Sequence, residues 1–193
     1  MMLRRCALAA AVLLLAACAQ VSKVADGDVV VRERLVVTVD TPWNQFERTM
    51  ADKVPTWTNE GLTIDALQFF VAIKDGELIS PTPSEPKGQR PLVFRAGMQA
   101  AEVVDLFQTL WTRDGSSLTI DKVAPEAFMG GNGFRIDYSR VRKVDEVRLQ
   151  GVAWGVVHNG ELYVIHYSAP RLAFFGRYLP RVEALAKTAR ARG

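Results

Sequence analysis

Cys18 is the residue whose surroundings point most directly to a chemistry. It follows Leu15-Ala16-Ala17, at the end of an apolar run that begins just after Arg4 and Arg5. A short positive segment, an apolar segment and small residues before a cleavage point form the layout of a secretory signal peptide. The apolar run of about 12 residues is shorter than the roughly 20 that a membrane-spanning helix needs. We therefore expect residues 1–17 to be a signal peptide that is removed, which leaves Cys18 as the first residue.

The run Leu15-Ala16-Ala17-Cys18 resembles the lipobox of bacterial lipoproteins. This resemblance implies that the Cys18 sulfur carries a diacylglyceryl group and that the freed amine is acylated, so that several acyl chains anchor the protein to a membrane. Ala19 stands where an aspartate is associated with retention in the inner membrane. We therefore expect an anchor in the outer membrane, facing the periplasm. The alternative is an ordinary secretory signal with an incidental cysteine, since Ala16 and Ala17 also fit a small-residue cleavage site.

Cysteine and charge content limit what the mature chain can do. Cys6 lies in the signal and Cys18 would carry the lipid, so the rest of the chain has no thiol for catalysis, a disulfide or a metal. Loss of Arg4 and Arg5 would lower the formal charge from +3 to +1, which is too little for the basic footprint of a nucleic-acid-binding protein. The remaining 150–175 residues, roughly, can build one hydrophobic core. We predict no cofactor and no nucleic-acid partner.

The rest of the sequence carries no convincing catalytic motif. Ser84 and Lys87 have Ser-x-x-Lys spacing, but prolines surround them, whereas that motif needs its serine at a helix start. His158 and His166 are expected in the turn and the returning strand of one hairpin, so they should not share a metal. The glycines in 130–133 could form an anion-binding nest of backbone amides, although a turn between two strands is the simpler explanation. We predict a protein that is not an enzyme, without catalytic or metal-binding residues.

Hydrophobic periodicity predicts mostly strands. Alternation over residues 29–39 indicates one strand with a single buried face. Asp75-Gly76 is typical of a tight turn, and Asn159-Gly160 of a two-residue hairpin. Further strands are expected over residues 62–73, 118–121, 134–139, 147–157 and 161–168.

Three segments are predicted as helices. Residues 98–112 carry an apolar stripe opposite a polar face, Thr41-Pro42 is typical of the start of a short helix over 43–51, and an amphipathic C-terminal helix begins near Pro180. The sum is an α+β fold, with an antiparallel sheet of about five to seven strands and helices packed on it. We assign residues 18–28 to a lipidated tether and residues 29–191 to a single domain, which a proline-rich loop at 80–91 interrupts.

The C-terminal half resembles the PsbP-like fold. The resemblance covers roughly residues 115–190 and rests on the segment 125–135, the hairpin that ends in Ala169-Pro170, the aromatic residues at 174, 175 and 178, and the closing helix. This fold takes its name from the extrinsic subunit of photosystem II, and bacterial envelope lipoproteins share it. The resemblance implies a non-catalytic adaptor or binding protein and carries over no site residues.

Two groups of residues are candidates for binding. A mixed-charge hairpin arm could dock an envelope protein partner, although it could equally be a solvated face; its candidate residues are Arg140, Arg142, Lys143 and Arg148. Aromatic side chains could line a small-molecule or lipid pocket; the candidates there are Trp43, Trp57 and His166, whereas Trp111 and Trp154 are expected in the core. We expect a lipid-anchored periplasmic adaptor or accessory factor of an envelope assembly. The alternative is a carrier lipoprotein with an aromatic pocket.

Overall fold

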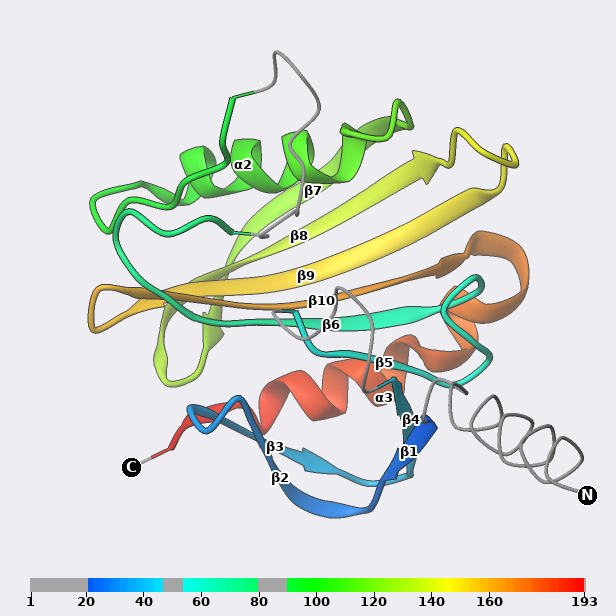
Figure 1. Ribbon diagram of the computed structural model, residues 1–193, viewed down its shortest axis with the longest axis horizontal. Coiled ribbons are helices and arrows are strands. Elements are labelled where there is room, and N and C mark those ends of the chain that lie inside the picture. Colours follow the sequence, from blue (N-terminus) through cyan, green and yellow to red (C-terminus); the bar gives the residue numbers. More distant parts are fainter. Residues whose placement is uncertain (1–20, 47–53, 80–89, 193) are drawn as a thin grey trace, which may run out of the picture.

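The computed structural model describes residues 21–46, 54–79 and 90–192. Within these residues, two antiparallel sheets and two α-helices stack in layers (Figure 1). Helix α2 covers one face of the large sheet, helix α3 lies against the other face, and the small sheet covers the far side of α3. The fold is therefore α+β, as predicted.

The large sheet has the strand order β1-β4-β5-β6-β10-β9-β8-β7, and the small sheet has the order β11-β3-β2. In chain order the elements are β1 (Val21–Val24), β2 (Gly27–Val31), β3 (Leu35–Val39), β4 (Trp43–Phe46), β5 (Thr56–Thr58), β6 (Ala66–Ile73), α2 (Ala100–Thr112), β7 (Ser117–Phe128), β8 (Gly131–Val141), β9 (Arg148–His158), β10 (Glu161–Pro170), the π-helical turn η3 (Arg171–Phe175), α3 (Gly176–Lys187) and β11 (Arg190–Ala191).

The central hairpins and helix α2 agree with the sequence pattern. Asn159 and Gly160 both have positive φ, 51° and 77°, as a two-residue hairpin turn between β9 and β10 requires. The turn between β7 and β8 consists of Met129 and Gly130, both with positive φ, whereas residues 131–133, which were expected in the turn, already belong to β8. Helix α2 begins at Ala100 with a capping box, in which the Gln99 N–H donates to the Glu102 carboxylate at 2.8 Å. Local signals were sufficient for these elements.

Two N-terminal predictions are wrong. Residues 29–39 do not form one strand, because Arg32 and Glu33 adopt positive φ and fold β3 back onto β2. This hairpin lets apolar residues of both strands pack over α3. Residues 43–46 are strand β4 rather than a helix, because pairing with β1 and β5 buries Trp43 against Tyr167. The remainder of that predicted helix, 47–53, lies outside the described residues.

Three further predictions differ from the structure: the length of the tether, the number of strands in the large sheet and the start of the last helix. The tether predicted at 18–28 is shorter, since Val21–Val24 already forms β1. The large sheet reaches eight strands, rather than five to seven, because β1, β4 and β5 add to it. The last helix begins at Gly176 instead of Pro180, because Phe175 stacks on Tyr167 and fixes the chain before the proline.

Several predictions fall on residues that the structure does not describe. The signal peptide, Cys18 and residues 80–89 of the proline-rich loop are among them. Within the described residues, none of the helices has the length and apolar character needed to cross a membrane.

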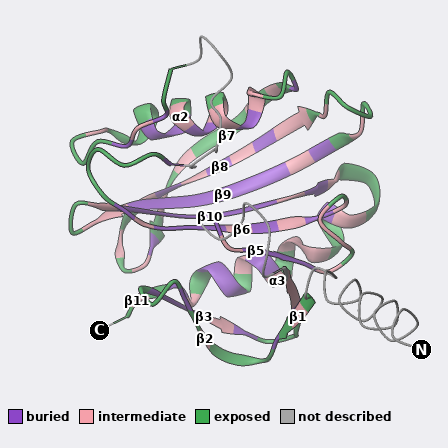
Figure 2. Ribbon diagram, in the orientation of Figure 1, coloured by how far each residue is buried: buried purple, intermediate pink, exposed green. Residues whose placement is uncertain are grey.

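The two faces of the large sheet carry separate hydrophobic cores (Figure 2). On the α2 face, the rings of Tyr138 and Phe134 from β8 lie over two glycines of β9. A Cβ atom on Gly151 would lie 2.2 Å from the Tyr138 ring, and one on Gly155 would lie 2.4 Å from the Phe134 ring. These glycines make room for the rings, since real Cβ atoms do not approach so closely.

Substitution of Gly151 by alanine should destabilise the fold. The added methyl group forces the Tyr138 ring out of place, and overpacking of this kind costs about 1–3 kcal/mol. The matched control is Gly176→Ala in α3, where a Cβ meets no atom within 4 Å and φ is −64°. This control should be neutral or stabilise by up to about 1 kcal/mol. Urea unfolding monitored by tryptophan fluorescence measures both, and equal stability of the two variants would contradict the packing described here.

Candidate functional site

The large sheet separates the residues of the predicted aromatic pocket. Trp43 and Trp57 lie in the core on the α3 face, each 1% exposed, whereas His166 is 3% exposed and belongs to the α2 face. The reason is the alternation along β10, which sends His166 and its neighbour Tyr167 to opposite sides. Trp111 and Trp154 lie in the core, as predicted. The predicted pocket of Trp43, Trp57 and His166 is therefore wrong.

His166 is a satisfied core residue. Its Nε2 lies 2.6 Å from the Tyr138 hydroxyl, and its Nδ1 lies 3.0 Å from the Gln68 side-chain oxygen. The Trp111 ring stacks on the imidazole at 4.6 Å between centroids. A neutral imidazole that donates from Nδ1 and accepts at Nε2 satisfies both contacts. Burial, assisted by the nearby Arg140, lowers the pKa of His166 to about 3, and burial raises the pKa of Tyr138. Both groups are therefore neutral at ordinary pH.

The depressed pKa of His166 makes stability dependent on pH. The unfolded chain binds a proton at the ordinary histidine pKa near 6.5, whereas the folded chain does not until about pH 3. The free energy of unfolding should therefore fall as pH drops through this window, by up to about 1.4 kcal/mol per pH unit. His166→Gln, which retains hydrogen-bonding groups but does not titrate, should lack this component. Urea unfolding of both proteins between about pH 7 and pH 5 tests this; parallel loss of stability would contradict it.

The charged hairpin arm is largely paired within the chain. Arg140 lies 2.5 Å from the Asp114 carboxylate. Arg142 holds both oxygens of Asp145, at 2.9 and 2.6 Å, and also donates to a backbone carbonyl. These contacts leave Lys143 and Arg148 as the exposed cations among the four predicted residues. The arm is therefore not one continuous basic surface.

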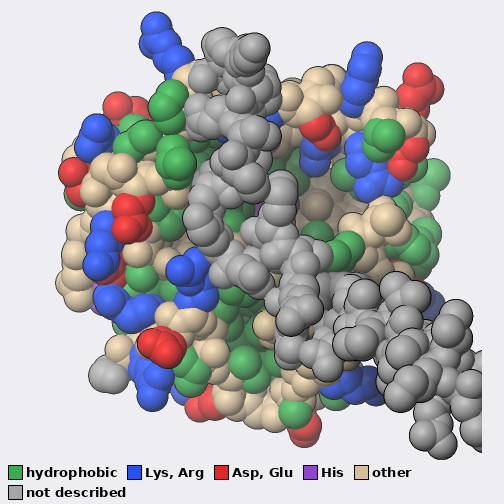
Figure 3. Space-filling view, in the orientation of Figure 1, with side chains coloured by type: hydrophobic (Ala, Val, Ile, Leu, Met, Phe, Trp, Pro, Cys, Tyr) green, Lys and Arg blue, Asp and Glu red, His purple; other side chains and the backbone are tan. Residues whose placement is uncertain are grey.

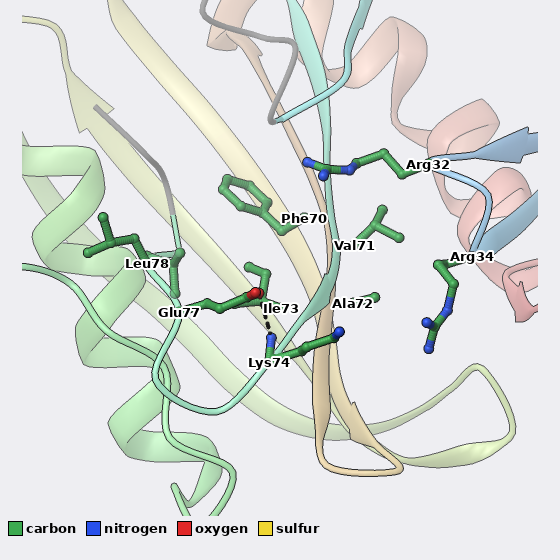
Figure 4. A pocket seen from close by; sticks show the side chains of 10 residues that line it. Arg32, Arg34, Phe70, Val71, Ala72, Ile73, Lys74, Glu77 and Leu78 are labelled. Atoms are coloured by element: carbon green, nitrogen blue, oxygen red, sulfur yellow. Dashed lines mark hydrogen bonds between the residues drawn. The ribbon is translucent and has the colours of Figure 1, made fainter. Parts of the chain in front are cut away.

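A cleft of about 520 Å³ lies beside β6 and is a better candidate (Figure 4). It combines apolar side chains, basic side chains and the backbone of a strand. The lining residues come from the β2–β3 turn, from β6 and from the segment after β6: Arg32, Arg34, Phe70, Val71, Ala72, Ile73, Lys74, Glu77, Leu78 and Ile79.

The second half of β6 presents a strand edge to this cleft. Strand β5 pairs with β6 only as far as Gln68, and the Phe69 N–H then donates to the Pro55 carbonyl at 3.0 Å. Beyond that point, the described part of the chain contributes no strand on this side of β6. The edge also carries a bulge, since Ala72 has a φ of 55° and the register with β10 shifts there. Backbone donors and acceptors of a strand edge are a template for pairing with another chain.

Basic side chains surround the mouth of the cleft. Arg32 and Arg34 come from the β2–β3 turn, and the exposed Lys74 follows β6. Arg34 lies 2.5 Å from Glu161, and the Glu77 carboxylate accepts the Lys74 backbone N–H at 3.0 Å. The turn holds Arg32 and Glu33 at φ values of 48° and 59°, which are unfavourable for residues other than glycine. Both values belong to the turn that folds β3 back onto β2.

The sequence pattern did not reveal the cleft, because Arg32 and Arg34 were interpreted as part of the solvent face of one strand over residues 29–39. The available signal was Glu33, which interrupts the apolar alternation of residues 29–39. With regard to metals, the described ranges contain no cluster of three or more His, Cys, Asp or Glu side chains that could hold an ion.

Comparisons with known proteins identify the fold. No family model matches the sequence, and no curated protein matches it. The solution structure of CyanoP, the cyanobacterial PsbP of Synechocystis sp. PCC 6803, aligns over 90% of this chain and 94% of that chain, with a TM-score of 0.57 and 11% sequence identity. At this identity the likeness concerns the fold alone. The chain has the PsbP-like fold, as its C-terminal half predicted.

A second solved structure is more distant. LpqN, which is involved in cell envelope biogenesis of Mycobacterium tuberculosis, aligns over 90% of this chain and 91% of that chain, with a TM-score of 0.37 and 10% identity. A likeness of this size supports no inference about fold or function.

Proposed function

We propose that this protein is a non-catalytic, lipid-anchored accessory protein of the bacterial cell envelope, which binds an acidic, extended segment of a partner protein in the cleft beside β6. The observation that carries this proposal is the combination of a strand edge with basic side chains in one cleft. Both features favour the same class of ligand.

An extended peptide uses a strand edge in a well-understood way. Its backbone pairs with the edge, and its alternate side chains enter pockets on either side. In the cleft, Leu78, which is 37% exposed, offers an apolar contact, while Arg32 and Lys74 favour carboxylates. A volume of about 520 Å³ lies within the range of small-ligand sites, roughly 300–1,000 Å³, and accommodates a few peptide residues.

The predicted lipid anchor places this cleft in the envelope. Cys18 precedes the first residue of β1 by three positions. Because an extended chain spans at most about 3.6 Å per residue, a lipid on Cys18 would hold the domain within roughly 11 Å of the membrane surface. We place the anchor in the outer membrane, facing the periplasm.

Cys18→Ala should abolish the anchor. The variant is expected to leave the membrane fraction and to lack the mass of the acyl groups, whereas the wild-type protein carries that mass on its first residue. Fractionation of cells and intact-mass spectrometry measure the two effects, and Ala19→Ser is the matched control that should behave like the wild type. A Cys18→Ala protein that stays membrane-bound with unchanged mass would refute the lipid anchor.

The cleft is tested by site-specific crosslinking in the native envelope. A photo-crosslinking amino acid at Leu78, which is 37% exposed and lines the cleft, should capture one partner at an acidic, extended segment. The same group at Val123 on the edge strand β7, which is 46% exposed, is the control. Reversing two charges with Arg32→Glu and Lys74→Glu should lower the yield at Leu78 by at least about tenfold, since close charge pairs contribute more than 1.4 kcal/mol.

A charge reversal outside the cleft completes this experiment. Lys122→Glu on β7 should leave the crosslink at Leu78 intact. Equal capture from Leu78 and Val123, or a yield that Arg32→Glu and Lys74→Glu do not change, would contradict the proposal. Capture of a lipid or small molecule at Leu78, in place of a peptide, would support the carrier function instead, with the cleft rather than the tryptophans as its pocket.

A further inference from the structure

Two apolar side chains at one end of the molecule lie outside both hydrophobic cores and are exposed to solvent. Leu172, in the π-helical turn η3, is 99% exposed, and Val144, in the turn between β8 and β9, is 84% exposed. Strand β9 begins and strand β10 ends at this same end, since Leu149 pairs with Pro170. Side chains exposed to this extent would gain free energy from burial against another surface.

Basic side chains stand beside these two residues. Arg148 and Arg171 line a common hollow of about 170 Å³ with the hydroxyl groups of three β7 and β8 residues, Ser117, Thr119 and Ser139. Lys143 precedes Val144 in the same turn and is exposed. Figure 3 shows basic and hydrophobic side chains close together at this end, with acidic ones among them.

The acidic residues of the turn do not cancel this charge. Asp145 is held by Arg142 in a two-oxygen ion pair, so the two together are neutral. Two acidic side chains oppose Lys143, Arg148 and Arg171: Glu146 in the turn, and Asp121 on β7, which accepts a hydrogen bond from the Ser139 hydroxyl at 2.7 Å. The exposed end therefore has a net positive charge, with apolar side chains at its tips.

The start of the described chain lies on the same side of the molecule. In Figure 1, β1, η3 and the β8–β9 turn are all on the right. A lipid on Cys18 would hold Val21 within roughly 11 Å of the bilayer, which allows this side to face the membrane. With this side toward the bilayer, the end with Leu172 and Val144 is directed at the lipid surface.

We propose that this end of the domain docks on an anionic membrane surface. Leu172 and Val144 enter the boundary between headgroups and acyl chains, and Lys143, Arg148 and Arg171 contact lipid phosphates. In the hollow between Arg148 and Arg171, the hydroxyl groups of Ser117 and Thr119 donate hydrogen bonds to a phosphate oxygen. This inference rests on the lipid anchor of the proposed function, and it adds a defined orientation to that anchor.

The orientation has a consequence for the cleft. Ile73, at the end of β6, pairs with Leu162 at the beginning of β10, whereas η3 follows the end of β10. The cleft beside Ile73 and Lys74 therefore lies toward the opposite end of the strand from the docking surface. Ten residues of strand separate them, roughly 33 Å. Docking would present the cleft to the aqueous side.

The test is the accessibility of single cysteines in the lipidated protein. The sequence contains no cysteine after Cys18, so a cysteine placed at Leu172, Val144 or Val30 is the one free thiol of the lipidated chain. Val30 on β2, which is 45% exposed and lies in the small sheet, is the matched control. Each variant carries an environment-sensitive fluorophore and is reconstituted in vesicles of phosphatidylcholine, with or without phosphatidylglycerol. Quenching by iodide then reports exposure to water.

We expect fluorophores at 172 and 144 to be shielded from iodide in the vesicles with phosphatidylglycerol, and the one at 30 to be quenched freely. Removal of two charges with Arg148→Gln and Arg171→Gln should lower the ratio of docked to undocked protein by roughly 30-fold. The pair Lys74→Gln and Arg95→Gln, at the cleft end, should have no such effect.

Three kinds of result would overturn the inference, and they are distinguishable. A purified protein without acyl mass refutes the anchor, and with it the orientation. A lipidated protein whose fluorophores at 172 and 144 are quenched as strongly as the one at 30 refutes the docking surface alone. Shielding that is unchanged by Arg148→Gln and Arg171→Gln, or by the absence of phosphatidylglycerol, also contradicts the proposal, because it excludes recognition of anionic lipid.

Discussion

The pairing of β9 with β10 is the constraint on which the rest of the structure depends. The two strands pair without interruption from the Asn159-Gly160 turn to Leu149 and Pro170. Strand β8 pairs with β9 on one side, and β6 pairs with β10 on the other. Helices α2 and α3 then cover the two faces. Since successive residues of a strand face opposite sides, this hairpin supplies both cores at once.

Burial on both faces explains the polar and glycine residues within the hairpin. His166 faces α2 among aromatic rings, where a protonated imidazole would be costly, and two hydrogen bonds satisfy its neutral form. Gly151 and Gly155 are required because the rings of Tyr138 and Phe134 lie over them. These residues could be mistaken for a reaction centre from their types alone. Their contacts show that they serve packing.

The features suited to binding lie where this regular pairing ends. The cleft occurs where β5 stops short of the second half of β6, which leaves a strand edge among basic side chains. The exposed Leu172 and Val144 occur where the strands turn, at the other end of the hairpin. A rigid sheet between them keeps the two features at a fixed separation. The proposed docking surface and the proposed partner site can therefore be occupied at the same time.

The sequence by itself determined the elements that local physics specifies. The Asn159-Gly160 turn, the apolar stripe of α2 and the alternation in β8 each arise from residues close together in the chain, so their patterns are visible before folding. The likeness of the C-terminal half to the PsbP-like fold rests on this same local order, and the comparison with CyanoP agrees with it.

Only the tertiary structure decided how distant segments meet. Strand β4 exists because β1 and β5 pair with it, although Thr41-Pro42 is a local helix signal. Trp43 and His166 lie on opposite faces because their strands join one sheet in a particular register. Arg140 is paired because folding brings Asp114 to it from a position 26 residues earlier in the chain. The cleft beside β6 likewise depends on where β5 ends. These outcomes follow from long-range pairing and burial, whose free energies exceed local propensities and which no short stretch of sequence encodes.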